Sequence, residues 1–142
     1  MTPIFVDTGF WLALKNKDDK WHVEASQVWE KVLSGELTDL FTTDYVLGET
    51  VSHVLRNKSW GSWERAKDIG SMILESKEVK SVHVEGTDVG RGWEIFLKYQ
   101  HADLTFTDCV SMAVMDRLGS KKVMGFDSDF EEVGRGYELV DG

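Results

Sequence analysis

Short apolar runs alternate with amphipathic stretches along the whole chain, and this alternation constrains the fold more than any other feature. We expect strands at residues 4–6, 40–43, 79–84, 122–126 and 137–140. We expect helices between them, at residues 10–14, 21–33, 45–55, 63–74, 88–99 and 108–118. Strands separated by helices make right-handed crossovers. The pattern therefore predicts an α/β domain with a mainly parallel sheet of about five strands, flanked by helices.

The chain has the length of one domain, 142 residues, and contains no repeats or flexible linkers. We therefore expect a single domain over residues 1–142. The sequence has no apolar run of about 18 residues, so no membrane span is predicted. Its start has no basic segment or cleavage site typical of a signal peptide. Cys109, the one cysteine, can form neither an internal disulfide nor a cysteine metal site, and the cytoplasm is the expected compartment.

The formal net charge is −9, from 25 acidic and 16 basic residues. An acidic protein is a poor general binder of nucleic acid, because phosphate neutralisation drives that affinity. Two interpretations remain open. The charge either serves solubility, or some of the acids gather at one place and bind a cation.

Four acids fall at the same end of the predicted sheet, where parallel α/β domains bind their ligands. Asp7 follows the first strand and Asp127 follows the strand at 122–126. Glu49 lies in the second turn of the helix after the strand at 40–43, and Asp108 lies in the first turn of its helix. Asp44 and Asp129 are nearby in sequence and form a second tier of candidates.

Each acid also has a local explanation. Asp7 and Asp127 have the position of helix N-caps. Thr105 and Asp108 have the spacing of a capping box. Glu49 falls on the side of its helix away from the apolar stripe at Leu47, Val51, Val54 and Leu55, so it also suits a solvated surface.

Two features favour a shared site. The helix at 108–118 is apolar nearly all round, and an aspartate in its first turn is costly unless it is capped, paired or bound to metal. Converging carboxylates also repel one another, which raises their pKa values unless a cation holds them ionised. Hard oxygen ligands suit Mg²⁺ or Mn²⁺, whereas the four histidines are scattered.

A divalent ion held by carboxylates activates water and neutralises phosphate charge, so hydrolysis of a phosphodiester is the natural reaction. Asp7 and Asp108 are expected as the main metal ligands. Glu49 and Asp127 then complete the shell or position the attacking water. The Thr8 hydroxyl, beside Asp7, suits either a metal-bound water, a phosphate, or helix initiation.

Four stretches carry a family resemblance over residues 4 to 130: FVDTGFWLAL, TTDYVLGETVSHVL, LTFTDCVSMAVMDRLG and VMGFDSDF. In this order and spacing the chain resembles the PIN-domain ribonucleases of the VapC toxin type. The resemblance places Asp7, Glu49, Asp108 and Asp127 on the family's four acids. It implies a parallel sheet flanked by helices, Mg²⁺ or Mn²⁺, cleavage of single-stranded regions of structured RNA, homodimers, and inhibition by a cognate antitoxin.

The chain departs from the family pattern at one position. The family often has Thr or Ser two residues before its last acid, and here that residue is Gly125. Asp129 then either supplements the site or caps the short helix that follows. An antitoxin arm carrying Arg or Lys suits the acidic site, since charge-assisted hydrogen bonds to carboxylates are strong.

Other classes of protein fit less well. A phosphatase of the haloacid dehalogenase type needs a second Asp where this chain has Gly9, and the acids and lysines of a receiver domain are not well placed. An RNA-processing PIN nuclease without an antitoxin and a catalytically silent PIN-like binding module remain open. The six tryptophans suit ordinary packing or contacts with partners, and Trp60 and Trp63 lie where they can stack on RNA bases.

Overall fold

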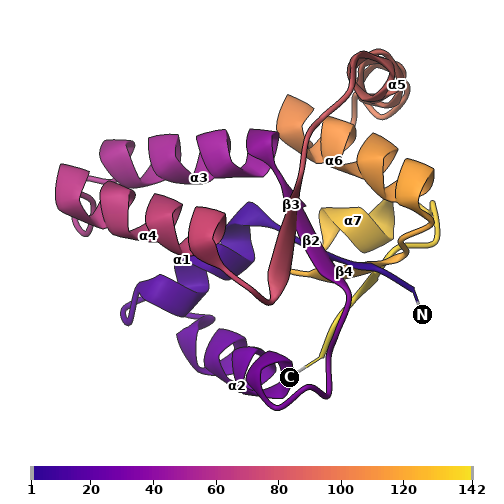
Figure 1. The fold of residues 1–142 in the computed structure, drawn as a ribbon. Helices are drawn as coiled ribbons and strands as arrows, with labels where there is room; N and C mark the ends of the chain where they lie inside the picture. The colour runs from indigo at the N-terminus through magenta and orange to yellow at the C-terminus, as the bar shows by residue number, and fades with distance from the viewer. Residues whose placement is uncertain (1, 142) are drawn as a thin grey trace.

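Five parallel strands form one sheet, in the order β3-β2-β1-β4-β5 (Figure 1). The computed structural model describes residues 2–141, so the two end positions of the predicted 1–142 domain lie outside it. The strands are β1 Ile4–Val6, β2 Leu40–Thr43, β3 Val79–Val82, β4 Lys122–Met124 and β5 Glu138–Leu139. The prediction of an α/β fold with a parallel sheet is confirmed.

Helices cover both faces of this sheet. They are α1 Thr8–Lys15, α2 His22–Leu33, α3 Asp44–Arg56, α4 Trp63–Glu75, α5 Gly86–Lys98, α6 Phe106–Leu118 and α7 Asp129–Glu132. The chain steps from β1 to β2 to β3 in one direction and then crosses back past β1 to β4. Right-handed crossovers put α1–α4 on one face and α6 on the other, as Figure 1 shows, with α5 packed on the outside of α6.

The core lies between the sheet and these helices. Every residue of β1 and β2 is buried, and from Cys109 to Met115 no residue of α6 is more than 1% exposed. The near-complete burial predicted for this helix is confirmed. Close packing of α5 on α6 depends on Gly92, since a Cβ there would lie 2.8 Å from Val110 Cγ2 and 2.9 Å from its Cα. Any other side chain at that position would push the two helices apart.

The orientation predicted for α3 is wrong. Its buried face consists of Val46, Thr50 and Val54, and Leu55 is 54% exposed. Leu47 and Val51 are half-buried because they face α4, where Gly70 would place a Cβ 3.2 Å from Val51 Cγ2. α3 therefore packs one face on the core and a second face on α4. The single apolar stripe in its sequence does not distinguish these two faces.

Two strands end earlier than predicted. β3 stops at Val82, and the amide of Val84 donates a 2.9 Å hydrogen bond to the carboxylate of Asp44. β4 stops at Met124, and the ring of Phe126 stacks on Trp21 with 5.1 Å between centroids. Phe126 thus packs against Trp21, just before α2, and does not extend β4.

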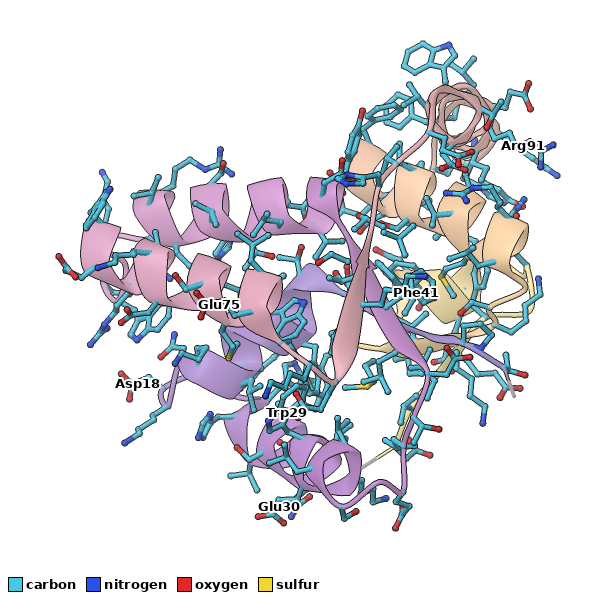
Figure 2. The ribbon with its side chains drawn as sticks, viewed as in Figure 1. Asp18, Trp29, Glu30, Phe41, Glu75 and Arg91 are labelled. Atoms are coloured by element: carbon cyan, nitrogen blue, oxygen red, sulfur yellow. The ribbon has the colours of Figure 1, made fainter. Side chains whose placement is uncertain are left out.

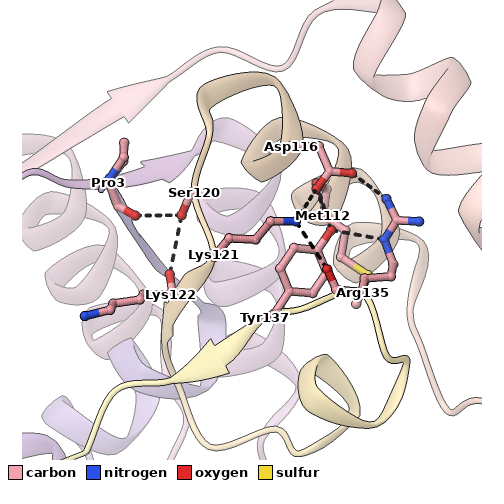
Figure 3. Close-up of polar contacts among 8 residues, drawn as sticks. All are labelled: Pro3, Met112, Asp116, Ser120, Lys121, Lys122, Arg135 and Tyr137. Carbon is pink, nitrogen blue, oxygen red and sulfur yellow. Dashed lines mark hydrogen bonds and ion pairs between the residues drawn. The ribbon is translucent and has the colours of Figure 1, made fainter. Parts of the chain in front are cut away.

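A polar network fixes the last strand at the amino edge of the sheet (Figure 3). The Tyr137 hydroxyl donates to Asp116 at 2.8 Å, and the Arg135 guanidinium pairs with the same carboxylate. Lys121 donates to the carbonyl of Arg135 at 3.2 Å. These hydrogen bonds and ion pairs join α6 to β5 and partner the half-buried Asp116 and Arg135 charges with each other. Over residues 2–141, no helix combines the length and the apolar character needed to cross a bilayer.

Candidate active site

Asp7 and Asp127 flank the point where the strand order reverses. β1 and β4 are neighbours, yet their following helices lead to different parts of the fold. Asp7 directly follows β1, and its amide donates a 3.0 Å hydrogen bond to the carbonyl of Met124, the last residue of β4. Asp127 lies three residues further on. Such a crevice, at the carboxyl ends of the strands, is where open parallel sheets bind ligands.

Glu49 and Asp108 reach the same edge from two helices. Glu49 lies in the second turn of α3, and Asp108 lies in the first turn of α6. The two helices are in contact, and Figure 1 shows their N-terminal ends side by side above the carboxyl edge of the sheet. Each helix N-terminus carries partial positive charge, which favours an anion there.

The four acids act on one another through charge. Burial raises the pKa of Asp7 well above its ordinary value, and the charges of Asp108, Glu49 and Asp127 raise it further. Burial also raises the pKa of Asp108 to about 6, with further contributions from Asp127 and Glu49. Asp7 and Asp108 are each 5% exposed, so water does little to relieve this repulsion.

Asp7 does not act as a side-chain cap. It occupies the N-cap position of α1, but its carboxylate makes no capping hydrogen bond. Its pKa is lowered only by a hydrogen bond from the Thr8 backbone, which burial outweighs. A buried carboxylate among other carboxylates is costly unless a cation binds it. Helix N-capping therefore does not explain the buried carboxylate of Asp7.

Asp108 does act as a cap, with one of its two oxygens. Its Oδ2 accepts the amide of Thr105 at 3.0 Å, and the Thr105 hydroxyl accepts the amide of Asp108 at 3.1 Å. This is the capping box that the sequence spacing indicated. Within residues 2–141, Oδ1 has no hydrogen-bond partner, which leaves it available to a ligand.

Asp127 belongs to a second group of acids. Its Oδ1 accepts the amide of Asp129 at 2.9 Å, so the carboxylate also orders the turn before α7. Burial raises the pKa of Asp127, and the charges of Asp129 and Asp103 raise it further. Asp129 is the first residue of α7 and is not its N-cap, which is Ser128. Asp103 is an acid that the sequence reasoning missed, and its place just before the capping Thr105 was the available signal.

Two of the secondary candidates have other partners. The Asp44 carboxylate accepts the amide of Val84 and lies 3.5 Å from the His83 ring, so it is engaged with the loop after β3. The Thr8 hydroxyl lies 3.2 Å from the hydroxyl of Thr50, which donates to the carbonyl of Val46 at 2.7 Å. Thr50 was not a sequence candidate. It joins α3 to the first residue of α1, beside Asp7.

Gly125 lies directly against Asp7. A Cβ at this position would be 3.2 Å from Asp7 Cβ and 3.5 Å from its Oδ2. The absence of a side chain therefore gives the Asp7 carboxylate room. This is the position where the sequence departs from the family pattern.

The donor set suits a hard divalent cation. Asp7, Asp108 and the neighbouring acids offer carboxylate oxygens, and like charges at a buried edge favour cation binding. Over residues 2–141, no three acidic, histidine or cysteine side chains are already gathered closely enough to hold one ion. Closing the acids on an ion therefore requires side-chain movement, for which the half-exposed Glu49 has room.

Known proteins resemble this chain over nearly its whole length. Residues 4–136 match the PIN domain model. The chain is 34% identical over 131 residues to a Mycobacterium tuberculosis protein described as 23S rRNA-specific endonuclease VapC20, covering 92% of this chain and 94% of the relative. The crystal structure of VapC20, described as a sarcin-ricin loop cleaving toxin, superposes with a TM-score of 0.83 at 30% identity, over 98% of this chain and 99% of that one.

More distant structures share the fold. VapBC2 from Rickettsia felis, bound to a promoter DNA fragment, has a TM-score of 0.65 at 14% identity, over 98% of both chains. DNA-bound VapBC from Salmonella typhimurium has a TM-score of 0.66 at 12% identity, over 99% of this chain and 98% of that one. The match to the PIN domain model and the match to VapC20 both cover nearly the whole chain. The chain therefore belongs to the VapC-type PIN-domain family.

Proposed function

We propose that this chain is a metal-dependent endoribonuclease that cleaves ribosomal RNA, and that it is the toxin of a toxin–antitoxin pair. The observation that carries the proposal is the buried Asp7 carboxylate, which has no capping bond and faces Asp108, Glu49 and Asp127. The 34% identity to a protein described as a 23S rRNA-specific endonuclease supports the choice of substrate.

Asp7 and Asp108 would hold Mg²⁺ or Mn²⁺, with Glu49 and Asp127 completing the shell. Bound there, the ion supplies charge neutralisation at phosphate and an acidified water. The capping box holds Asp108 in one orientation, so Oδ1 faces away from the bond made by Oδ2. Asp127 is similarly oriented by the Asp129 amide. Thr8 and Thr50 position the start of α1 and hence the Asp7 backbone.

RNA is the anion that this edge of the sheet is suited to receive. The first turns of α3 and α6 add favourable potential for a phosphate beside the acids. Without a cation, the acids would repel that phosphate. Substrate binding and metal binding are therefore coupled at the site, and cleavage should depend on the divalent ion.

The inhibitor of this site would be a cognate antitoxin. Structures of distant relatives are described as VapBC assemblies. An antitoxin arm carrying Arg or Lys matches the four acids in charge and competes with the metal. Homodimer formation stays a prediction from the family resemblance, and a cytoplasmic location stays a prediction from the sequence.

The decisive experiment incubates the purified protein with 23S rRNA in Mg²⁺, in Mn²⁺ and in EDTA, with Asp7→Asn as the matched inactive variant. We expect discrete cleavage with metal and none in EDTA or with the variant. Intact rRNA under all conditions would contradict the nuclease proposal and favour a silent binding module. Cleavage that persists in EDTA would contradict the metal site.

A further inference from the structure

A second site lies at the far ends of α1 and α3, away from the acids. A cavity of about 590 Å³ lies between the end of α1, the α3–α4 loop and the start of α4. Lys15, Lys17 and Arg65 contribute three cations to its lining, and Trp60 contributes an aromatic ring. Asp18 and Asp68 contribute two acids, so the cavity is positive by one charge in a chain whose net charge is −9. Asp18, labelled in Figure 2, lies in the segment that follows α1.

The three cations form no direct ion pair. Within residues 2–141, Lys15, Lys17 and Arg65 form no ion pair shorter than 4.0 Å. At the opposite end of the fold, Arg135 and Lys121 line a cavity and are both paired with Asp116, although Lys98 in the same wall forms no ion pair with the described residues. Cations without acidic partners are available to an anionic ligand.

The aromatic part of the cavity is built rigidly. The Arg65 guanidinium lies 4.9 Å from the centre of the Trp60 ring and donates to the Trp60 carbonyl at 2.7 Å. The Asn57 side chain accepts the amides of Ser59 and Trp60, each at 3.0 Å. Gly61 allows the tight turn, because a Cβ there would lie 1.8 Å from the Val54 carbonyl oxygen. Nucleic-acid bases stack on such guanidinium and indole planes.

The distance to the acids suits one continuous ligand. α1 starts at Thr8, directly after Asp7, and ends at Lys15, a rise of about 12 Å at 1.5 Å per residue. α3 starts at the same edge, contacts α1, and ends beside the cavity. A stacked helical strand rises about 3.4 Å per nucleotide and an extended one rises more, so a few nucleotides span this interval.

We propose that the cavity formed by Lys15, Lys17, Trp60 and Arg65 is an RNA-backbone site that holds the substrate a few nucleotides from the scissile bond. This inference rests on the proposed function, because it places the same RNA in both sites. An acidic protein needs local cations to bind RNA, and this cavity combines unpaired cations with a stacking surface. It binds phosphate and base without reading sequence.

The test compares two triple variants with the same change in charge. K15Q/K17Q/R65Q removes the cations of the cavity. K58Q/K67Q/K77Q removes three exposed lysines that do not line it. Binding of a short fluorescent RNA hairpin carrying the sarcin-ricin loop is measured in the Asp7→Asn background, from about 50 to about 200 mM salt. Thermal melting confirms that both variants are folded.

We expect the cavity variant to bind at least about tenfold more weakly at the lowest salt, with the slope of log K against log salt reduced by about 2. In the control variant, the slope should fall by less than half as much as in the cavity variant. In the active background, the cavity variant should raise KM with kcat unchanged, since uniform binding is lost. Arg65→Lys keeps the charge but loses the planar stack, and it should weaken binding without changing the slope.

Two outcomes separate this inference from the proposed function. If the wild type cleaves RNA and both triple variants bind alike, the cavity site is wrong and the nuclease proposal stands. If no cleavage is seen but the slope still falls for the cavity variant alone, the cavity binds RNA, whereas the nuclease proposal and the placement relative to a scissile bond are both wrong.

Discussion

The amide of Asp7 donates a 3.0 Å hydrogen bond to the carbonyl of Met124, so the residue that follows β1 is tied to the end of β4. This bond extends the parallel pairing of Val6 with Met124 by one step. It fixes the Asp7 backbone at the centre of the sheet and places its carboxylate beside Gly125. The position of the proposed metal ligand is thus set by the sheet and not by a flexible loop.

Asp7→Asn and Asp108→Asn should each lower rRNA cleavage by at least about a hundredfold, because loss of a ligand removes several kcal/mol of stabilisation from the transition state. Both variants should stay folded, since Asn keeps the oxygen that accepts the Thr105 amide in the capping box. Cleavage rates and circular dichroism check this. Asp44→Asn is the matched control and should remain active, because the Asp44 carboxylate serves the Val84 amide. Full activity in both site variants would refute the ligand assignment.

Without metal, the protein should become less stable as the pH rises from about 4 to about 6. Burial raises the pKa of Asp108 to about 6 from an ordinary value of 3.8, so the folded state binds more protons than the unfolded state in that window. The associated stability is present below pH 4 and is lost as the pH passes 6. Its size is on the order of 3 kcal/mol.

Thermal melting in EDTA and in Mg²⁺ measures this effect. Asp108→Asn should melt higher than the wild type in EDTA at pH 7 and should gain less from Mg²⁺. Metal that binds the folded state at a hundred times its Kd adds roughly 2.7 kcal/mol. These acids would be structural if metal left the wild-type melting temperature unchanged and Asp108→Asn were less stable than the wild type in both conditions.

Gly125→Ala should lower cleavage several-fold while the fold is retained. The new methyl group would meet Asp7 Cβ at 3.2 Å, so the carboxylate must move by a few tenths of an ångström, and misplacement of a reacting group is costly. Steady-state kinetics with saturating metal check this, and the matched control is Gly48→Ala, where the space is open. Equal activity of both variants would show that Asp7 tolerates displacement.

Thr50→Val should destabilise the protein by about 1–2 kcal/mol, because the buried Thr8 hydroxyl loses its partner without a replacement. Thr50→Ser keeps the hydroxyl and should be close to the wild type in activity. Urea denaturation and cleavage assays check the pair. If Thr50→Val matches the wild type in both, the contact between α3 and α1 does not position Asp7.

The sequence predicts this fold well because most elements have one buried face. β1 and α6 are buried on nearly all sides, and their apolar runs are plain in the sequence. The face of α3 could not be predicted, because its core position is occupied by the polar Thr50, whose partner Thr8 is 42 residues away. The end of β4 was missed because Phe126 finds its apolar contact on Trp21, which only the tertiary structure brings near.

The candidate site, like the fold, could be predicted from the sequence only in part. Periodicity and strand order were enough to bring four acids to one edge of the sheet, because parallel strands share their carboxyl ends. They could not separate the roles of those acids. One carboxylate oxygen of Asp108 and one of Asp127 each accept a hydrogen bond from a backbone amide, whereas Asp7 accepts no capping hydrogen bond. That difference depends on side-chain geometry, as does the nearness of Asp103 to Asp127.

The distribution of the four acids along the chain has a consequence for synthesis. Asp7 leaves the ribosome first and Asp127 last, with nearly the whole domain between them. β4 must insert beside β1 before Asp127 can reach the site, because the two strands are central neighbours in the sheet. A nascent chain therefore lacks a complete set of acids until translation is almost finished.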